Sequence, residues 1–309
     1  SGTPGTGTFT ATASTSETGT SGSVTINVGA PVQIQLSDPT DGTTDAPVQV
    51  TVNTLDSSSN IASSDNSTQF TISVDGSATL SNASAGSFVS GSGTATATVQ
   101  VASGTFTCDI SDSTAETVNI TITDSQSTGY TLVGTPQDVV FAVGAASEIS
   151  VQAISDTTAG TPTSVTAKVI DAGGNTVTSA ATTFTLTATG NGGPAFGSAS
   201  VGTINSGSGT SQVEVQASSG VVTLSLNDYL AETVTVASVD SDSTGYAVNS
   251  ESVTFNPGTV NEVQLVAPGE TAQPGTSSGE GKTGTVSYQT AGATFTVTVN
   301  AVDQYYNVV

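Results

Sequence analysis

Carboxylates in loops are the residues of this sequence with the clearest capacity for chemistry. Ca²⁺ in proteins takes six to eight oxygen ligands from carboxylates, carbonyls and side-chain amides. Such oxygens are concentrated in the turn at 37–45 (SDPTDGTTD), the loops at 110–116 (ISDSTAE) and 226–232 (LNDYLAE), and the turns at 124–127 (DSQS) and 240–243 (DSDS). The sequence therefore predicts Ca²⁺ as a bound cofactor, with the candidate ligands Asp38, Asp41, Asp45, Asp112, Glu116, Asp124, Asp228, Glu232, Asp240 and Asp242.

The same aspartates have an alternative role as turn caps, because an aspartate in a loop accepts hydrogen bonds from backbone N–H groups of its own turn. We expect this role for Asp56, Asp171 and Asp303, each of which is followed four residues later by an asparagine. The EF-hand pattern of calcium ligands is absent from the sequence. Both interpretations stay open for the candidate calcium ligands.

The charge balance of the 309 residues is strongly acidic, with 25 Asp and Glu against 2 Lys and Arg and a net charge of −23. Affinity for nucleic-acid backbones depends on Lys and Arg, so nucleic-acid binding is disfavoured. Anionic membrane surfaces are disfavoured for the same reason. We expect an atmosphere of accumulated cations. Few salt bridges can form, so geometry, salt or bound metal must separate the like charges.

Catalytic chemistry has little support in this composition. The chain has no histidine and one cysteine, which excludes Ser-His-Asp and Cys-His mechanisms and His/Cys zinc sites. Paired carboxylates could hydrolyse glycosides, but that activity predicts a sugar-stacking cleft, and the chain has no tryptophan and only 5% aromatic residues. We expect that the protein is not an enzyme.

The sequence repeats itself at a fixed spacing of 116 residues. Residues 115–130 (AETVNITITDSQSTGY) match 231–246 (AETVTVASVDSDSTGY), and 90–112 match 206–228. A period of this length indicates whole small domains in tandem. Cys108 matches Leu224 in this alignment, which predicts a buried cysteine that acts as a small hydrophobic residue.

Each repeat contains about seven short runs in which apolar and polar residues alternate, separated by Gly, Asp, Asn, Ser and Pro. Helical periodicity is not sustained anywhere. Seven antiparallel strands in about 100–115 residues are typical of an immunoglobulin-like sandwich. The predicted fold is all-β, with tandem immunoglobulin-like β-sandwich domains arranged as beads on a string. The expected divisions are 1–20 (closing strand of a preceding repeat), 21–135, 136–250 and 251–309 (first part of a further repeat).

A family resemblance is carried by AKVIDAGGNTV at 167–177 and VNAVDQYYNVV at 299–309. These segments resemble the strand-turn segment of bacterial and archaeal immunoglobulin-like surface repeats, namely the invasin/intimin-like Big modules and related S-layer domains. The third repeat departs from the family pattern, because Tyr306 stands where Gly174 precedes the asparagine in the second. The resemblance implies an extracellular structural or adhesive role and supplies no catalytic residues.

These observations predict a structural protein of the cell surface, part of an S-layer lattice or an extracellular filament, acidic and stabilised by cations. Two alternatives remain: the stalk of a surface adhesin with a separate binding head, and a carbohydrate-binding accessory module. The expected partners are copies of the same chain or other surface proteins, glycans and cations. No run approaches the ~20 apolar residues that cross a membrane, so we expect no direct membrane insertion.

Three N-glycosylation sequons and two tyrosines are further candidates for contacts outside the chain. The sequons are at Asn66 and Asn82, in expected loops, and at Asn119, in an expected strand whose side chain must point outward to be modified. Tyr130 and Tyr246 close the two copies of STGY. We expect these rings to seal a junction between domains; sugar stacking is the alternative.

Overall fold

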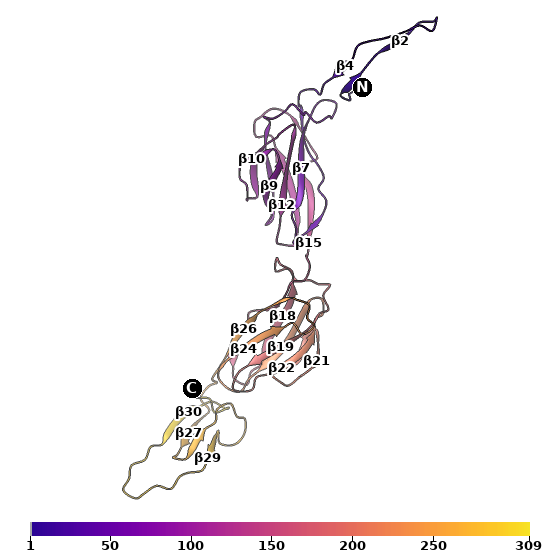
Figure 1. Cartoon of the computed structure of the whole chain (residues 1–309). Coiled ribbons are helices and arrows are strands. Elements are labelled where there is room, and N and C mark those ends of the chain that lie inside the picture. Colours follow the sequence, from indigo (N-terminus) through magenta and orange to yellow (C-terminus); the bar gives the residue numbers. More distant parts are fainter. Residues whose placement is uncertain (1) are drawn as a thin grey trace. The chain divides into compact units, whose positions relative to one another are not determined.

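The structure is a computed structural model that describes residues 2–309 and is all-β, as predicted (Figure 1). The chain divides into two compact units. Unit 1 is Ser1–Gly144 with Gly173–Asn175, and unit 2 is Ala145–Ala172 with Thr176–Val309. Residues 2–309 contain no helix with the length and hydropathy of a membrane span.

Unit 1 contains a sandwich of two sheets, which we call sandwich 1. One sheet has the strand order β14-β5-β7-β12-β9, and the other β10-β11-β8-β13-β15-β6. The strands of sandwich 1 are β5 (Gln33–Leu36), β6 (Gly42–Thr43), β7 (Val48–Leu55), β8 (Gln69–Val74), β9 (Thr79–Ala85), β10 (Ser87–Ser90), β11 (Thr96–Gln100), β12 (Thr105–Ser111), β13 (Thr117–Thr123), β14 (Thr131–Val133) and β15 (Gln137–Ala142).

The core of sandwich 1 forms because alternate residues of each strand point between the sheets. Phe70 of β8 and Phe106 of β12, from opposite sheets, are fully buried and meet edge to face, with ring centroids 6.0 Å apart. Cys108 lies two residues after Phe106 on the same face of β12 and is fully buried, as predicted. Threonine fills many of the outward positions, so each sheet presents a hydroxyl-rich face to water.

Unit 2 contains the second copy, sandwich 2, with the strand orders β20-β23-β18-β16-β25 and β17-β26-β24-β19-β22-β21. Its core again joins alternate residues of the two sheets around Phe184, Phe196 and Phe255. Its strands are β16 (Glu148–Val151), β17 (Thr157–Thr158), β18 (Thr163–Ile170), β19 (Thr183–Thr189), β20 (Ala195–Val201), β21 (Thr203–Ser206), β22 (Gln212–Gln216), β23 (Val221–Asn227), β24 (Thr233–Val239), β25 (Ala247–Val248) and β26 (Ser250–Asn256).

The first two strands of each sandwich pair with its last two, and both pairs are parallel. In sandwich 1, β14 runs parallel to β5, and β15 runs parallel to β6. In sandwich 2, β25 runs parallel to β16, and β26 runs parallel to β17. The other ladders of both sandwiches are antiparallel. The strands by which the chain enters and leaves a sandwich are therefore hydrogen-bonded side by side.

Short ladders lie before sandwich 1 and after sandwich 2. At the start of the chain, β1 (Gly5–Gly7) pairs with β4 (Val24–Ile26), and β2 (Thr10–Thr12) pairs with β3 (Thr18–Thr20). After sandwich 2, β27 (Glu262–Val266) pairs with β30 (Thr298–Val302), and β28 (Glu270–Ala272) forms a hairpin with β29 (Lys282–Gly284). The antiparallel pairing of β27 with β30 repeats that of β16 with β18.

The expected domain boundaries fall too early in the chain. The segments at 139–144 and 253–258 were expected to open a repeat, but they contribute β15 and β26, which close one. Val139 pairs with Val118, and Val253 pairs with Val234, so each segment fills the core of the sandwich that precedes it. Sandwich 1 therefore ends near residue 144 instead of 135, and sandwich 2 ends near 256 instead of 250. The ladder that precedes sandwich 1 reaches Ile26, beyond the expected limit of 20.

We predict that the Cys108 thiol of the folded protein does not react with an aromatic disulfide reagent at pH 8. Burial raises the pKa of Cys108 to about 12, with a smaller contribution from the negative charge of Asp109. Roughly one thiol in ten thousand is then ionised at pH 8, and only the thiolate is nucleophilic. The absorbance of the released thiol measures the reaction, and the same protein in concentrated denaturant is the control. Equal reaction rates in both conditions would contradict a buried cysteine.

Candidate functional sites at the ends of the sandwiches

The D-x-x-x-N turn at 303–307 is built around a buried aspartate. Asp303 is 1% exposed, and its Oδ1 accepts hydrogen bonds from the backbone N–H groups of Tyr305 (2.8 Å) and Asn307 (2.9 Å). Its Oδ2 accepts from the Gly258 N–H (2.8 Å) and the Asn307 side-chain amide (3.0 Å). Desolvation by burial opposes ionisation, but these hydrogen bonds outweigh it and lower the pKa of Asp303 below its ordinary value. The carboxylate is thus held by neutral donors instead of by a basic side chain.

The turn at 56–60 in unit 1 has the same construction. Asp56 accepts hydrogen bonds from the backbone N–H groups of Asn60 (2.9 Å), Gly29 (3.0 Å) and Ser58 (2.8 Å). The bond from Asn60 and then the bond from Gly29 contribute most to lowering the pKa of Asp56 to about 2. The predicted turn-capping role of Asp56 and Asp303 is confirmed. Asp171, the third member of this set, is buried at the start of the turn that follows β18.

The asparagine that ends each turn also binds backbone groups outside the turn. Asn307 donates from its side-chain amide to the Tyr229 carbonyl (2.9 Å), and its Oδ1 accepts from the Ala231 N–H (2.9 Å). We call this pair of hydrogen bonds the asparagine clasp. Asn175, which belongs to unit 1, forms the same clasp with the Ser113 carbonyl (2.7 Å) and the Ala115 N–H (3.1 Å). Because Tyr229 and Ala231 lie 116 residues after Ser113 and Ala115, both clasps bind equivalent loops.

Aromatic packing accompanies the clasp in unit 2. The Tyr229 and Tyr305 rings lie with centroids 4.9 Å apart and planes inclined by 56°. The Tyr305 ring also covers Gly160, where a Cβ atom would lie within 2.1 Å of a ring carbon. A side chain at position 160 would therefore displace the ring. Near the clasp, an open hollow of about 410 Å³ is lined by residues that include Ala231, Glu232 and Asn307.

The loops that the clasps bind are the two predicted calcium loops that pair an aspartate with a glutamate. In unit 1, the Ser77 hydroxyl lies 2.6 Å from Asp112 Oδ1 and 3.2 Å from Glu116 Oε1. Glu116 also accepts from the Ser77 N–H (2.8 Å), and Asp112 from the Thr114 N–H (2.8 Å). The structure therefore brings Asp112 and Glu116 together around a shared hydroxyl donor, as their spacing predicted.

In unit 2 the position that corresponds to Ser77 is Gly193, which has no side-chain hydroxyl to donate to the acidic pair. Asp228 Oδ1 accepts from the Leu230 N–H (2.9 Å), and Glu232 Oε1 accepts from the Gly192 N–H (2.6 Å). Burial, together with the neighbouring Glu232 carboxylate, raises the pKa of Asp228 to about 6. Burial also disfavours the charged form of Glu232, but hydrogen bonds from Gly192 and Asn191 outweigh it and lower the pKa of Glu232. Glu232 thus keeps its negative charge, and this charge opposes the ionisation of Asp228.

Both aspartates of these pairs carry a buried oxygen without a hydrogen-bond partner within residues 2–309. Asp112 is 4% exposed and Asp228 is 1% exposed, and the unpartnered atom is Oδ2 in each. Asp65, at 7% exposure, has a third such oxygen. A buried polar atom without a partner typically costs about 1–3 kcal/mol. Its recurrence at the same position of both repeats therefore calls for a physical explanation.

The other predicted calcium ligands are dispersed. Asp38, Asp41, Asp45 and Asp242 are exposed; Asp41 Oδ1 accepts from the Val140 N–H (2.9 Å), and Asp45 lies beside Gly144. Asp124 and Asp240 cap their own turns through the N–H groups of Gly129 (3.0 Å) and Gly245 (2.8 Å), respectively. In the described part of the chain, no three carboxylate, cysteine or histidine side chains gather as a metal site.

The sequon asparagines are all at the surface. Asn66 lies in a loop, where its Oδ1 accepts from the Ser103 N–H (2.8 Å). Asn82 lies in strand β9 and not in the expected loop, and its φ of 49° marks an irregular strand. Asn119 points outward from β13 and donates to Asp75 Oδ2 (3.0 Å). Glycosylation of these residues stays a prediction.

The tyrosines of the STGY segments pack against their own sandwiches. Tyr130 is half-buried against the core of sandwich 1, and Tyr246 against the core of sandwich 2. We expected Tyr130 and Tyr246 to seal a junction between domains. Their rings pack on their own sandwiches instead, and the ring contact described above joins Tyr229 and Tyr305. Tyr288 is fully exposed, in the loop between β29 and β30.

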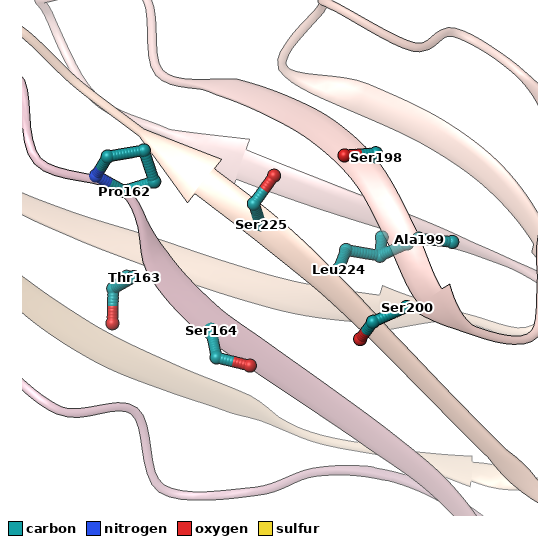
Figure 2. A pocket seen from close by; sticks show the side chains of 8 residues that line it. All are labelled: Pro162, Thr163, Ser164, Ser198, Ala199, Ser200, Leu224 and Ser225. Atoms are coloured by element: carbon teal, nitrogen blue, oxygen red, sulfur yellow. The ribbon is translucent and has the colours of Figure 1, made fainter.

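A hollow of about 320 Å³ lies over β18, β20 and β23 of sandwich 2 (Figure 2). Its lining consists of small and hydroxyl-bearing residues: Pro162, Thr163, Ser164, Ser198, Ala199, Ser200, Leu224 and Ser225. The hollow adjoins an irregularity in the pairing of β20 with β23, between Phe196 and Ala199. The lining contains neither a titratable nor an aromatic side chain, so we assign it no chemistry.

Sequence reasoning missed the residues whose roles depend on contacts distant in sequence. It assigned the asparagine of the D-x-x-x-N turn to turn formation and missed the clasp. It also missed Ser77 and Asn191, which lie beside the acidic pairs. One signal could have indicated the clasp: Asp and Asn recur in all three turns although the residues between them differ completely (SSS, AGG and QYY).

The fold and these sites define the class of the chain as an all-β protein built from immunoglobulin-like sandwiches. No protein-family model matches the sequence, and no curated protein matches it. Among solved structures, the chain is similar to FdeC, an adhesin of Escherichia coli, at 18% identity over 81% of this chain and 72% of that one, with a TM-score of 0.33. It is also similar to the D0-D1 domain of intimin, at 14% identity over 73% and 98% of the two chains, with a TM-score of 0.24.

A β-glycosidase from Bacteroides vulgatus is similar at 9% identity with a TM-score of 0.33. The match covers 74% of this chain and spans 25% of the glycosidase. TM-scores this low do not support assigning the chain to the family of any of these proteins.

We predict that Asp56→Asn lowers the melting temperature of unit 1 at pH 6 and has little effect near pH 2. The folded-state pKa of Asp56 is below its ordinary value of 3.8. The stability that this carboxylate contributes is therefore present above about pH 4 and is lost as the pH falls toward 2. Calorimetry of both proteins between pH 6 and pH 2 measures the difference, and Asp138→Asn, at an exposed position of β15, is the control. A difference that does not change with pH would contradict this role of Asp56.

Proposed function

We propose that this chain is a load-bearing spacer of an extracellular cell-surface protein. In this role the sandwiches carry tension along the chain, and the asparagine clasps hold in place the loops that follow β12 and β23. The acidic surface, screened by cations, keeps neighbouring chains soluble. This function requires no catalytic residue.

The observation that carries the proposal is the parallel pairing of the first two strands of each sandwich with its last two. Tension enters a sandwich at the start of its first strand and leaves at the end of its last strand. When a strand near the entry and a strand near the exit are parallel neighbours, the pull slides them past each other and loads their hydrogen bonds together. Antiparallel neighbours pulled in the same way would separate one bond at a time. Both sandwiches have the resistant arrangement, in two strand pairs each.

The recurrence of the asparagine clasp supports the same proposal. Asn175 and Asn307 bind equivalent loops through both polar atoms of their amide groups. Each clasp fixes the side chain to two backbone groups, and the Asp303 carboxylate holds the Asn307 amide in place. A loop held in this way has a fixed geometry that a flexible Gly/Ser segment does not provide.

We predict that Thr131→Pro weakens sandwich 1 under force. The Thr131 N–H donates to the Val32 carbonyl (3.0 Å) where β14 meets β5, and proline removes this donor. Loss of one hydrogen bond, worth about 1 kcal/mol of the barrier, speeds forced unfolding roughly fivefold. Single-molecule pulling on the whole chain measures the rate. Ser87→Pro, in edge strand β10, is the control because β10 pairs with neither the first nor the last strand. Equal effects of the two substitutions would contradict the proposed load path.

The surface location has its own test. An antibody raised against unit 2 is expected to label intact cells of the source organism, and electron microscopy of the labelled surface distinguishes a lattice, a filament and a stalk. Labelling that requires permeabilised cells would overturn the proposal of an extracellular spacer.

A further inference from the structure

The acidic pair of sandwich 2 lies where the core ends. Inward positions of β23 are occupied by Val222, Leu224 and Leu226, all buried. Asp228 is the next residue in this inward row, and it is as buried as the leucines. Its Oδ1 is satisfied by the Leu230 N–H, whereas its Oδ2 has no hydrogen-bond partner in the described structure. A charged oxygen therefore sits at the end of an apolar layer.

The Glu232 carboxyl group lies near this aspartate, because both side chains border Gly192. Glu232 Oε1 accepts from the Gly192 N–H, and Asn191 donates to the same carboxylate. The loop approaches closely because Gly192 has no side chain: a Cβ there would lie within 2.2 Å of Asp228 Oδ1. The two carboxylates and the loop at 191–192 thus lie together at this end of the core.

No basic side chain of the chain neutralises this pair. Lys282 binds Glu270 (3.1 Å) and Glu280 (3.4 Å). Lys168 lies opposite Val221, at the other end of β23 from Asp228. Two carboxylates that are desolvated together and lack a cation repel each other. The charge balance of the site is therefore incomplete without a species from solution.

We infer that the Asp228–Glu232 pair binds a divalent cation with the oxygen preference of Ca²⁺, using Asp228 Oδ2 and the Glu232 carboxylate as protein ligands. Water molecules fill the rest of the coordination sphere. Glu232 also lines the open hollow described above, so its side chain borders solvent. With two protein carboxylates, the expected affinity is that of extracellular calcium modules, about 10⁻⁴–10⁻³ M.

The Asp112–Glu116 pair of unit 1 differs from the Asp228–Glu232 pair, and this difference supports the inference. There the Ser77 hydroxyl lies between Asp112 and Glu116 and donates a hydrogen bond into the pair. Asp112 Oδ2 nevertheless stays buried and unpartnered in the described residues, as in unit 2. A hydroxyl donor partly replaces the positive charge, so the same cation should bind more weakly at this pair.

Binding of the cation would act on the clasped loop. Asp228 and Glu232 flank residues 229–231, and Asn307 binds the backbone of Tyr229 and Ala231. An ion that joins the two carboxylates fixes both ends of the segment that the clasp holds. This mechanical consequence rests on the proposed spacer function, whereas the ion site itself does not.

Terbium luminescence tests the site directly on the whole chain. Tb³⁺ shares the oxygen preference of Ca²⁺, and Tyr229 is adjacent to Asp228, so excitation of tyrosine should sensitise Tb³⁺ emission. We expect emission that Ca²⁺ displaces at millimolar concentration and that Asp228→Asn and Glu232→Gln each reduce at least about tenfold, as expected when one of two charged ligands is lost. Asp240→Asn, which removes a turn cap of equal charge at the other end of β24, should leave the emission unchanged.

A stability measurement gives a second readout. In chelator-treated protein at constant ionic strength, 10 mM Ca²⁺ should raise the melting temperature of unit 2 by about 5 °C. This increase should be absent in Asp228→Asn, whose folding is checked by circular dichroism. An equal increase with added NaCl would show that salt screens the charges without binding at the site. The absence of any increase would show that a proton shared by the two carboxyl groups, and not Ca²⁺, neutralises the pair. Either result, or Tb³⁺ emission that survives Asp228→Asn, overturns the inference.

These outcomes are independent of the proposed surface role. A chain that binds Ca²⁺ at Asp228 but is absent from the cell surface would retain the site and lose the proposed function. A chain that is present at the cell surface but does not bind Ca²⁺ would lose the site and retain the proposed function.

Discussion

A scarcity of positive charge constrains every polar feature of this protein. With 25 acidic residues and two lysines, almost no carboxylate can form a salt bridge. The buried aspartates are held by backbone N–H groups instead: Asp56 and Asp303 each accept three of them. Because backbone donors have fixed directions, each ionised aspartate imposes a specific local chain conformation. Neutral donors thus do in this fold what arginine and lysine do in most others.

This constraint connects the D-x-x-x-N turns to the asparagine clasps. The Asp303 carboxylate orients the Asn307 amide, which then binds the loop between Asp228 and Glu232. Wherever backbone donors are too few, a carboxylate oxygen is left unsatisfied, as at Asp228. The acidic pairs are therefore the sites where the shortage of positive charge is met least completely by the protein itself.

Much of the fold follows from local sequence pattern. Strands such as β8 and β13 alternate polar residues with Phe, Ile or Val over their whole length, and this period-two signal needs no tertiary information. Strands β9 and β20 were missed because Gly, Ser and Ala occupy most of their positions and only a few residues, such as Leu80 and Phe196, enter the core. Strands β10 and β21 were missed because each has only four residues, none of them fully buried. The boundaries were misplaced for another reason: whether Val139 opens one sandwich or closes another depends on its pairing with Val118, which a linear pattern does not encode.

The candidate sites, like the fold, could be predicted from the sequence only in part. The equivalence of Asp112 with Asp228, and of Glu116 with Glu232, was readable from the 116-residue repeat. Their burial and unpartnered oxygens were not, because these depend on where the inward row of β12 or β23 ends. The role of Asn307 was hidden because its partners lie 76 and 78 residues earlier in the chain.

The cores of the two sandwiches differ in a way that matters while the chain is being made. Phe106 and Leu80 of sandwich 1 correspond to Val222 and Phe196 of sandwich 2, so the large ring lies on β12 in sandwich 1 and on β20 in sandwich 2. Neighbouring repeats of similar sequence are prone to exchange strands as they emerge from the ribosome. A β12 that took the place of β23 would put Phe106 where sandwich 2 holds Val222, and the larger side chain would overfill that interior. The different placement of the large ring therefore disfavours exchange of these strands between neighbouring repeats.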